Sequence, residues 1–232
     1  MVKLRVVAYN VRSLRDERPA AIRVLRELDA DVVCVQEAPR FFRWRSKNAA
    51  LAREAGLLYV GGGRTANGVA MLAAHRVDVS NVIEYRLSRT PRQIRRGLVA
   101  ARIHKAGAWC TVASVHFGLD ADERLRHRRE IVGLVNRYES PVTILAGDIN
   151  ESPGMPTWQA LAVEFTDAGA EGNAPTFSAR NPQRRIDGVF VRGPAVVQAC
   201  WVADGPEAEA ASDHRPVVAD LEIPPVADLK AR

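Results

Sequence analysis

The chain has 232 residues, of which 47% are hydrophobic and 26% charged, and it carries a formal net charge of +6 with a pI near 9.6. This composition is typical of a globular protein and excludes a disordered or fibrous chain. No stretch approaches the ~20 apolar residues of a membrane span. The excess of Lys and Arg over Asp and Glu favours a polyanionic partner, such as nucleic acid, a phosphorylated metabolite or an anionic lipid headgroup.

The sequence predicts a simple domain organisation. No linker, repeat or low-complexity tract divides the chain, so we expect a single domain over residues 1–225 and a short polar tail over residues 226–232. Lys3, Arg5 and Arg12 interrupt the apolar residues at the amino terminus, which argues against a signal peptide. The three cysteines are far apart and odd in number, so they cannot form a closed disulfide framework. We expect a cytoplasmic protein that acts as a monomer.

The front half of the chain alternates between strand and helix patterns. The expected elements are, in chain order, a strand at 3–11, a helix at 17–28, a strand at 31–37 and a helix at 41–55. In the second helix Phe41, Trp44, Leu51 and Ala55 fall on one apolar stripe, which predicts that they face the core. The glycine cluster "GGGRTANG" that follows lacks the Lys and Ser or Thr of a phosphate-binding P-loop, and we interpret it as a flexible connection.

The rest of the chain is rich in strands. Four strands with short polar gaps, as in an antiparallel meander, are expected at 67–74, 77–87, 96–104 and 109–117. A helix with a capping-box-like start at Asp120 and Glu123 should reach Tyr138. Further elements are expected as a strand at 141–147, a helix at 155–165 and strands at 184–191, 196–203 and 215–223. Many strands with a few helices outside them predict a two-sheet α/β sandwich.

Several apolar strands end in a polar residue where an apolar residue or a simple turn former would serve. These residues are Asn10, Gln36, Glu37, His116, Asp148, Asn150, Asp187, Ser212, Asp213 and His214. Each alone is typical of an ordinary turn, as in the stretch "GDIN". Together they are consistent with a site that strand ends project toward one point.

Oxygen donors predominate in this set. Asn10, Glu37, Asp148, Asn150 and Asp213 all offer oxygen, and such hard donors select Mg²⁺ or Mn²⁺ over zinc, which favours thiolate and imidazole. The remaining members supply two imidazoles, His116 and His214, for proton transfer, and one carboxylate, Asp187, that can orient a histidine.

In these motifs the sequence resembles the endonuclease/exonuclease/phosphatase superfamily, which includes pancreatic deoxyribonucleases, abasic-site endonucleases, neutral sphingomyelinases and inositol polyphosphate phosphatases. The matching motifs, in the family's order, are "YNV", "VQEA", "SVHFG", "GDIN", "RRIDGVFV" and "SDHRPV", and they span nearly the whole chain. The resemblance implies a four-layered α/β sandwich, in which two mostly antiparallel sheets pack face to face with helices outside. It also implies an active site at one end of the two sheets.

The resemblance implies roles for the oxygen donors. Glu37 would be the principal metal ligand, with Asn10 and Asp213 nearby. Asp148 and Asn150 would hold the attacking water, a second metal or the phosphate.

The resemblance also implies roles for the two histidines. His214, oriented by Asp187, would act as base or as transition-state stabiliser, and His116 would contact the scissile phosphate or protonate the leaving oxygen. The abasic-site branch is expected to carry tyrosine in place of His116, so the chain looks less like a dedicated abasic-site enzyme. Gly188 stands where the family often has an aromatic residue, and we expect an altered substrate pocket there.

Arginines provide the candidate substrate contacts. Arg92 and Arg96 in "SRTPRQIRRG" and Arg185 in "ARNPQRR" lie in or beside predicted loops near the proposed site, where they would bind a polyanion. The segment "PRFFRWRSK" interleaves arginines with aromatics, but on a helix the aromatics should face the core.

The sequence thus predicts a Mg²⁺-dependent phosphodiester hydrolase, a nuclease acting on DNA or RNA. One alternative is a phosphatase or phospholipase-like phosphodiesterase acting on a small phosphorylated substrate or a lipid headgroup. Another is a catalytically silent nucleic-acid-binding protein of the same fold. A serine hydrolase is excluded because no G-x-S-x-G stretch exists.

Overall fold

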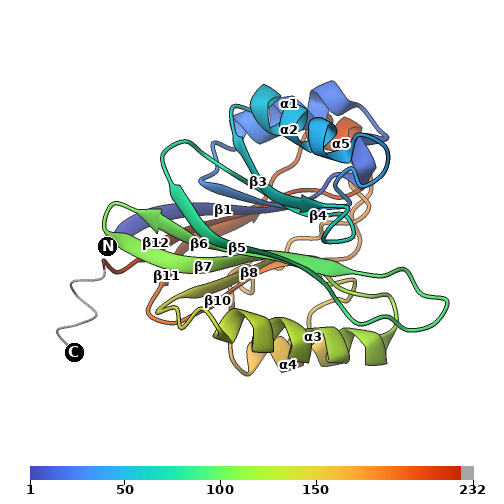
Figure 1. Ribbon diagram of the computed structural model, residues 1–232. Helices are drawn as coiled ribbons and strands as arrows, with labels where there is room; N and C mark the ends of the chain where they lie inside the picture. Colours follow the sequence, from blue (N-terminus) through green and yellow to red (C-terminus); the bar gives the residue numbers. More distant parts are fainter. Residues whose placement is uncertain (226–232) are drawn as a thin grey trace.

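The computed structural model describes residues 1–225, and the predicted tail over residues 226–232 lies outside them. Two stacked sheets form its two inner layers, and helices cover both outer faces (Figure 1). One sheet carries α1 (Arg18–Glu27), α2 (Trp44–Glu54) and α5 (Pro206–Ala211), and the other carries α3 (Ala121–Asn136) and α4 (Pro156–Ala162). The predicted four-layered sandwich is therefore confirmed. None of the helices within residues 1–225 is both long and apolar enough to cross a membrane.

The two sheets share one topology. In spatial order, the first holds β11 (Val196–Val202), β12 (Val217–Ile223), β1 (Val2–Asn10), β2 (Val32–Gln36), β4 (Val69–Ala73) and β3 (Leu58–Gly63). The second holds β5 (Asp78–Arg86), β6 (Gly97–Lys105), β7 (Ala108–His116), β8 (Thr143–Asp148), β10 (Asp187–Arg192) and β9 (Thr166–Asp167). Each sheet has one parallel pair, β1 with β2 and β7 with β8, and its other neighbours are antiparallel.

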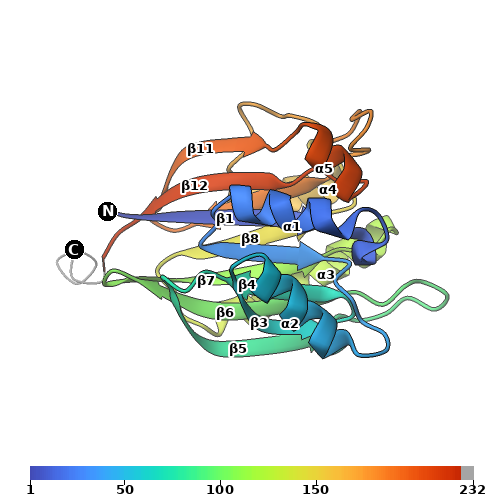
Figure 2. The ribbon, with the colours of Figure 1, turned by 90° about the horizontal axis from the view of Figure 1, so that it is seen from above.

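The two parallel strand pairs bring the polar residues at their carboxyl ends to one end of the molecule. A parallel pair needs a crossover, and α1 and α3 supply the two crossovers. The carboxyl ends of β1, β2, β7 and β8 therefore lie at one end of the sandwich, opposite the amino terminus (Figures 1 and 2). These strands end at Asn10, Gln36, His116 and Asp148, which are residues of the predicted set.

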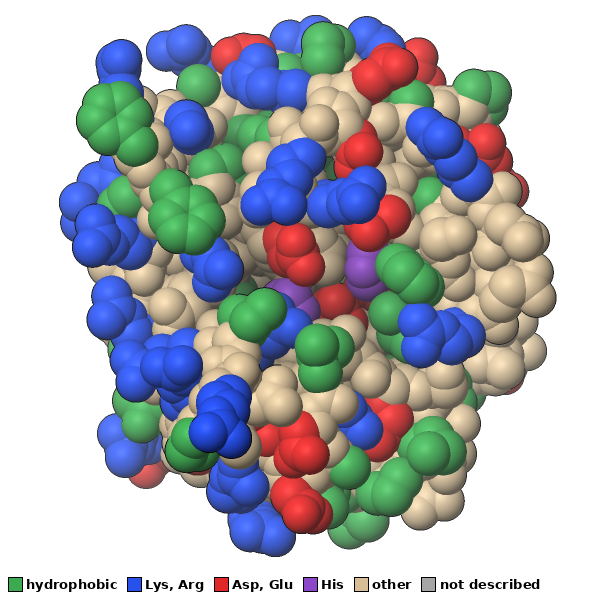
Figure 3. Space-filling model, turned by 90° about the vertical axis from the view of Figure 1, so that its right-hand side faces the viewer, with side chains coloured by type: hydrophobic (Ala, Val, Ile, Leu, Met, Phe, Trp, Pro, Cys, Tyr) green, Lys and Arg blue, Asp and Glu red, His purple; other side chains and the backbone are tan. Residues whose placement is uncertain are grey.

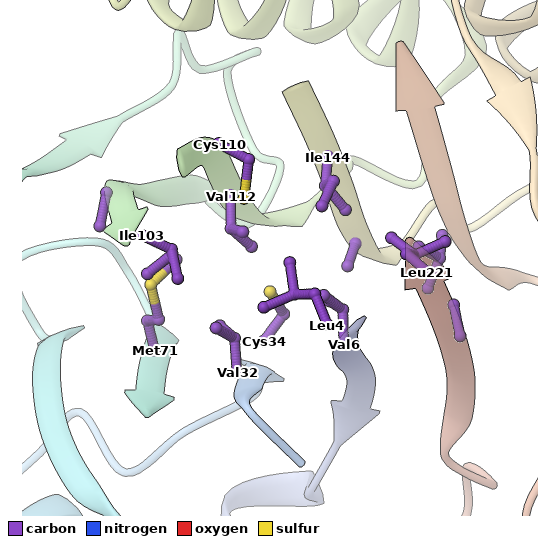
Figure 4. Packing of buried hydrophobic residues seen from close by; sticks show 14 of the residues in the cluster. Leu4, Val6, Val32, Cys34, Met71, Ile103, Cys110, Val112, Ile144 and Leu221 are labelled. Atoms are coloured by element: carbon purple, nitrogen blue, oxygen red, sulfur yellow. The ribbon is translucent and has the colours of Figure 1, made fainter. Parts of the chain in front are cut away.

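Both faces of the central strands are buried, which explains their nearly continuous apolar runs. Along β1, Leu4 and Val6 point into the core between the sheets, whereas Val7 points toward the helices. Figure 4 shows the inter-sheet core, where Cys34 and Cys110 lie among aliphatic side chains. Burial raises the pKa of both thiols, so they are uncharged packing residues.

Two strand predictions were wrong. The expected four-strand meander is reduced to β5, β6 and β7, because β4 pairs with β2 in the other sheet. The glycine cluster is not a flexible connection, since Gly61, Gly62 and Gly63 lie in β3. A Cβ at Gly63 would stand 2.6 Å from the Trp44 ring, so glycine allows α2 to pack directly on the strand.

The start of α2 also differs from the prediction. The helix begins at Trp44, after Arg43 in the left-handed conformation at φ 55°, so Phe41 and Phe42 precede it in a turn. These two residues are 69% and 82% exposed, and only Trp44 of the three aromatics packs on the sheet. The helix at Asp120 was predicted correctly, because Asp120 Oδ1 accepts a 2.9 Å hydrogen bond from Glu123 N. The short helix α5 was missed.

Candidate active site

Strand register brings most of the predicted polar residues to one place. His116 pairs with Asp148 across β7 and β8, and Asp148 pairs with Asp187 across β8 and β10. Asn10 reaches this group from the other sheet, because its Nδ2 lies 3.1 Å from Asp148 Oδ2 and 3.4 Å from His214 Nε2. Figure 3 shows histidine and acidic side chains together near the middle of this end, with Lys and Arg side chains around them.

Asp148 is at the centre of the group. Its Oδ2 accepts from Asn10 and lies 3.3 Å from His116 Nε2, and its Oδ1 accepts from Asn150 N at 2.9 Å. Burial alone would raise the pKa of Asp148, but the imidazoles of His116 and His214 outweigh burial and hold it well below the usual range. Asp148 is therefore an ionised carboxylate that several donors hold in one orientation.

His214 and Asp187 form a buried dyad. His214 Nδ1 lies 2.9 Å from Asp187 Oδ2, which also accepts a 2.6 Å hydrogen bond from Thr176 Oγ1. Burial alone would lower the pKa of His214, but the carboxylates of Asp187 and Asp148 raise it to about 10. With Nδ1 turned toward Asp187, Nε2 faces the interior of the site, 3.9 Å from Asp148 Oδ2.

Arg96 fixes the tautomer of His116. Its Nη1 lies 3.3 Å from His116 Nδ1, and a guanidinium can only donate, so Nδ1 accepts and Nε2 carries the proton toward Asp148. Burial and the neighbouring Arg96 charge together lower the pKa of His116, which keeps the imidazole neutral. Arg96 itself is only 8% exposed. The side chain of Arg96, at the end of the loop that precedes β6, therefore lies in the site and not in solvent.

Glu37 and Asp213 form the more open part of the site. Glu37 follows the last residue of β2 at φ 50°, a left-handed conformation that is uncommon outside glycine and often found at functional positions. Its charge favours the protonated forms of Arg12, Arg96 and His116, which places Glu37 near these three residues. Asp213 Oδ2 lies 3.3 Å from Arg12 Nε.

The donor set fits a hard divalent cation. Within residues 1–225 no hydrogen bond or ion pair joins the Glu37 carboxylate to another side chain, so its oxygens are available to a ligand. Asn150 donates through Nδ2 to Phe117 O at 3.0 Å, which leaves its Oδ1 for a ligand. The donor atoms of Asp148, Asp187 and His214 also lie within 4.8 Å of one another. However, His214 and Asp187 are hydrogen-bonded to each other, which makes these three side chains less available to a cation, and the predicted cation site at Glu37 and its neighbours stays a prediction.

The predicted substrate arginines have different environments. Arg92 is exposed on the loop between β5 and β6, as expected. The prediction for Arg185 was wrong, because its side chain is buried in an ion pair with Asp167 and lies 4.9 Å from the Trp158 ring. Trp158 also packs beside Gly188, where a Cβ would stand 3.1 Å from it. Trp158 thus occupies the space beside the glycine that the sequence marked as unusual.

Two supporting residues, Thr176 and Phe177, were not predicted from the sequence, and a third, Ser212, was predicted only as a member of the polar set. Thr176 donates to Asp187, and the ring of Phe177 packs 5.0 Å from that of His214. Ser212 Oγ donates to Asn10 O at 2.7 Å and so ties the loop that carries His214 to β1. Ser212 stands in the "SDHRPV" motif, whereas Thr176 and Phe177 lie outside strands with an apolar pattern and gave no signal.

Comparison with known proteins decides the family. The sequence profile of the Endonuclease/Exonuclease/phosphatase family matches residues 7–214. The chain belongs to this family. Members of the family are metal-dependent phosphoester hydrolases, and the chain is therefore a metal-dependent phosphoesterase. No curated protein matches the sequence.

Solved structures with the same fold have different activities. An endonuclease/exonuclease/phosphatase from Bacteroides vulgatus is 18% identical, with a TM-score of 0.80 over 97% of this chain and 100% of that one. The mannosyl-6-phosphatase of Bacteroides thetaiotaomicron is 19% identical, with a TM-score of 0.80 over 95% and 100%. D. rerio TDP2, solved with a single-strand DNA product, is 16% identical, with a TM-score of 0.73 over 96% and 100%. At these identities the likeness shows the fold alone.

Helix α3 of this phosphoesterase anchors the β5–β6 loop, residues 87–96, at the active-site end (Figures 1 and 2). Ser88 N donates to Glu130 Oε2, and Thr90 N donates to Glu123 Oε1, both at 2.9 Å. His127, which is fully buried, accepts from Gly118 N at Nδ1 and so donates from Nε2 to Ser88 O at 2.9 Å. The loop that carries the exposed arginines is thus held in place.

We expect acid to weaken this anchor through His127. Burial lowers the pKa of His127 in the folded chain. Below about pH 6.5, His127 therefore binds a proton in the unfolded chain but not in the folded chain. The free energy of unfolding should therefore fall as the pH drops below 6.5, by up to ~1.4 kcal/mol per pH unit from this group. Urea unfolding from pH 7.5 to 5 measures this slope. His127→Gln should flatten it and exposed His75→Gln should not; equal slopes in the three proteins would refute the assignment.

Proposed function

We propose that this phosphoesterase is a Mg²⁺-dependent phosphodiester hydrolase, with Mn²⁺ as an alternative ion, and that it cleaves DNA or RNA. The observation that carries the proposal is the anchored β5–β6 loop, whose exposed Arg89, Arg92 and Arg95 lead to the buried Arg96 against His116. A run of arginines on an anchored loop that leads to the catalytic group suits a substrate with successive phosphates better than a single phosphate.

Asp148, His214 and His116 each have a different role in the proposed reaction. Asp148, held ionised, accepts a hydrogen bond from the attacking water and orients it. His214, held charged by Asp187, stabilises negative charge on the phosphoryl oxygens as the water attacks. His116, neutral with its proton on Nε2, donates to Asp148 and keeps that carboxylate in place.

Glu37, with Asn10 and Asp213 beside it, would hold the cation. When bound, a divalent cation supplies Lewis-acid neutralisation of charge on the phosphoryl group and lowers the pKa of a bound water. Glu37 supplies the negative charge that retains the ion. Asp213, whose present partner is the half-exposed Arg12, can exchange that ion pair for the cation.

Two solved relatives in fold bear on the substrate. D. rerio TDP2 was solved in complex with a single-strand DNA product, which supports a polynucleotide substrate, whereas the Bacteroides thetaiotaomicron relative is a mannosyl-6-phosphatase. The formal charge of +6 favours the polynucleotide. That the enzyme is a single-domain monomer of the cytoplasm stays a prediction.

Salt dependence of DNA binding tests the substrate proposal. If the arginines of the β5–β6 loop contact phosphates, log Kd for a DNA oligonucleotide in EDTA should rise linearly with log salt concentration. Arg92→Ala should reduce the slope of that line by about 1, as expected for the loss of one phosphate contact. Arg53→Ala, an exposed arginine on α2, is the matched control. Absence of DNA binding at low salt, with hydrolysis confined to small phosphomonoesters, would contradict the proposal.

A further inference from the structure

Phe41 and Phe42 form an exposed aromatic pair next to the active site. They occupy the turn between β2 and α2, four and five residues after Glu37, and are 69% and 82% exposed. Single exposed apolar residues are common on soluble proteins, but two adjacent phenylalanines exposed to this extent are not accounted for by packing within residues 1–225. Nothing in the phosphoesterase chemistry described above uses them.

The pair lines a groove of about 450 Å³ together with Arg40, Arg64, Asn67 and Arg86. The lining contains no acidic residue. None of its arginines forms an ion pair within residues 1–225; Arg40 and Arg86 are held by backbone carbonyls instead. We call these six residues the aromatic groove. Its volume is in the range of small-ligand sites and its charge suits an anion.

The aromatic groove adjoins the active site at two places. Asn67 Nδ2 donates to Arg96 O at 3.4 Å, and Arg96 contacts His116. A Cβ on Gly68 would lie 3.4 Å from Arg40 and 3.8 Å from the Glu37 Cα, so Arg40 stands against the loop beside the proposed metal ligand. The groove therefore lies next to the active site, within reach of a substrate chain held there. Figure 3 shows Lys and Arg side chains interspersed with large hydrophobic ones along one side of the acidic and histidine cluster.

The two rings differ in availability. The Arg40 guanidinium lies 5.2 Å from the Phe41 ring centroid, a cation–π distance, so one face of Phe41 is partly covered. No cation lies over the Phe42 ring within residues 1–225, and Phe42 is the more exposed of the two. Phe42 thus offers a ring face to a flat ligand, with Arg64 and Arg86 near enough to contact charges attached to that ligand.

We propose that the aromatic groove binds an unpaired nucleotide of the substrate strand, with its base stacked on Phe42 and its phosphates on Arg64 and Arg86. This inference rests on the proposed nuclease function and names the substrate as single-stranded. Stacking needs a base free of its complementary strand, and aromatic rings with flanking arginines bind single strands with little sequence preference.

Binding in EDTA tests the groove apart from catalysis. The probes are a fluorescein-labelled oligothymidylate and a chain of the same length and charge made of abasic sites, followed by fluorescence anisotropy. Phe42→Ala should raise Kd for oligothymidylate about tenfold and leave Kd for the abasic chain unchanged. Phe42→Trp should bind both probes as the native protein does.

Arg86→Ala should weaken binding of both probes, because both carry phosphates. Val163→Ala, at an exposed residue that follows α4, is the control.

Three outcomes would overturn the inference. Unchanged oligothymidylate binding in Phe42→Ala would remove base stacking, and equal weakening of both probes would mean that Phe42 only shapes the groove. Binding to phosphatidylserine vesicles that Phe42→Ala abolishes, with no effect on either oligonucleotide, would identify a membrane surface instead. Failure of the proposed nuclease function can be distinguished from failure of the groove proposal. In that case oligothymidylate binding would still depend on Phe42, but Mg²⁺ would produce no cleavage.

Discussion

Glu37→Gln is expected to lower the rate of Mg²⁺-dependent hydrolysis by ~10²-fold or more. The substitution keeps the shape of the side chain but removes the negative charge that would retain the cation. Because no side chain within residues 1–225 pairs with this carboxylate, the free energy of unfolding should stay within ~0.5 kcal/mol of the native value. Initial rates on bis-p-nitrophenyl phosphate across a Mg²⁺ titration, together with urea unfolding, measure both effects.

Glu171→Gln is the matched control, since Glu171 is exposed and has no hydrogen bond or ion pair within residues 1–225. It should behave as the native enzyme. A Glu37→Gln enzyme with a near-native rate and an unchanged Mg²⁺ midpoint would show that another residue holds the cation.

Asp187→Asn should reduce kcat by ~10²-fold or more and alter its pH dependence. The carboxylate of Asp187 is the largest of the influences that raise the pKa of His214 to about 10. Without it, only the weaker influences of Asp148 and Asp213 oppose burial, so the pKa of His214 should fall and the imidazole should lose its proton at a lower pH. The alkaline decline in kcat should therefore move to lower pH in the variant, which a pH–rate profile on bis-p-nitrophenyl phosphate measures.

Asp122→Asn, in the exposed first turn of α3, serves as the control for Asp187→Asn. The two variants distinguish a positioning role from a general loss of negative charge. If kcat fell in Asp187→Asn while the alkaline decline stayed at the native pH, Asp187 would not set the charge of His214.

The strand-end residues were predictable because their signal is local. An apolar run that stops at Asn10, Glu37, His116 or Asp148 reveals both the strand and its polar end, and parallel pairing brings such ends together. The dyad of His214 with Asp187 was less accessible, since 27 residues separate the pair and only the family resemblance joined them.

The wrong predictions concern residues whose environment is set by parts of the chain far away in the sequence or by an unusual backbone conformation. Arg184 and Arg185 are adjacent and alike in sequence, but only Arg185 has Asp167 and Trp158 beside it, and those partners come from other elements. Phe41 was expected on an apolar stripe, yet the helix starts three residues later because Arg43 adopts a left-handed conformation. Neither packing nor backbone conformation at these positions has a local signal.

Cleavage of a labelled single-stranded oligonucleotide by the purified protein tests directly whether the enzyme is a nuclease. We expect fragments in the presence of Mg²⁺, none after EDTA is added, and renewed cleavage when Mg²⁺ is restored in excess. Oligonucleotides that stay intact with Mg²⁺ and with Mn²⁺, while small phosphomonoesters are hydrolysed, would contradict the nuclease function.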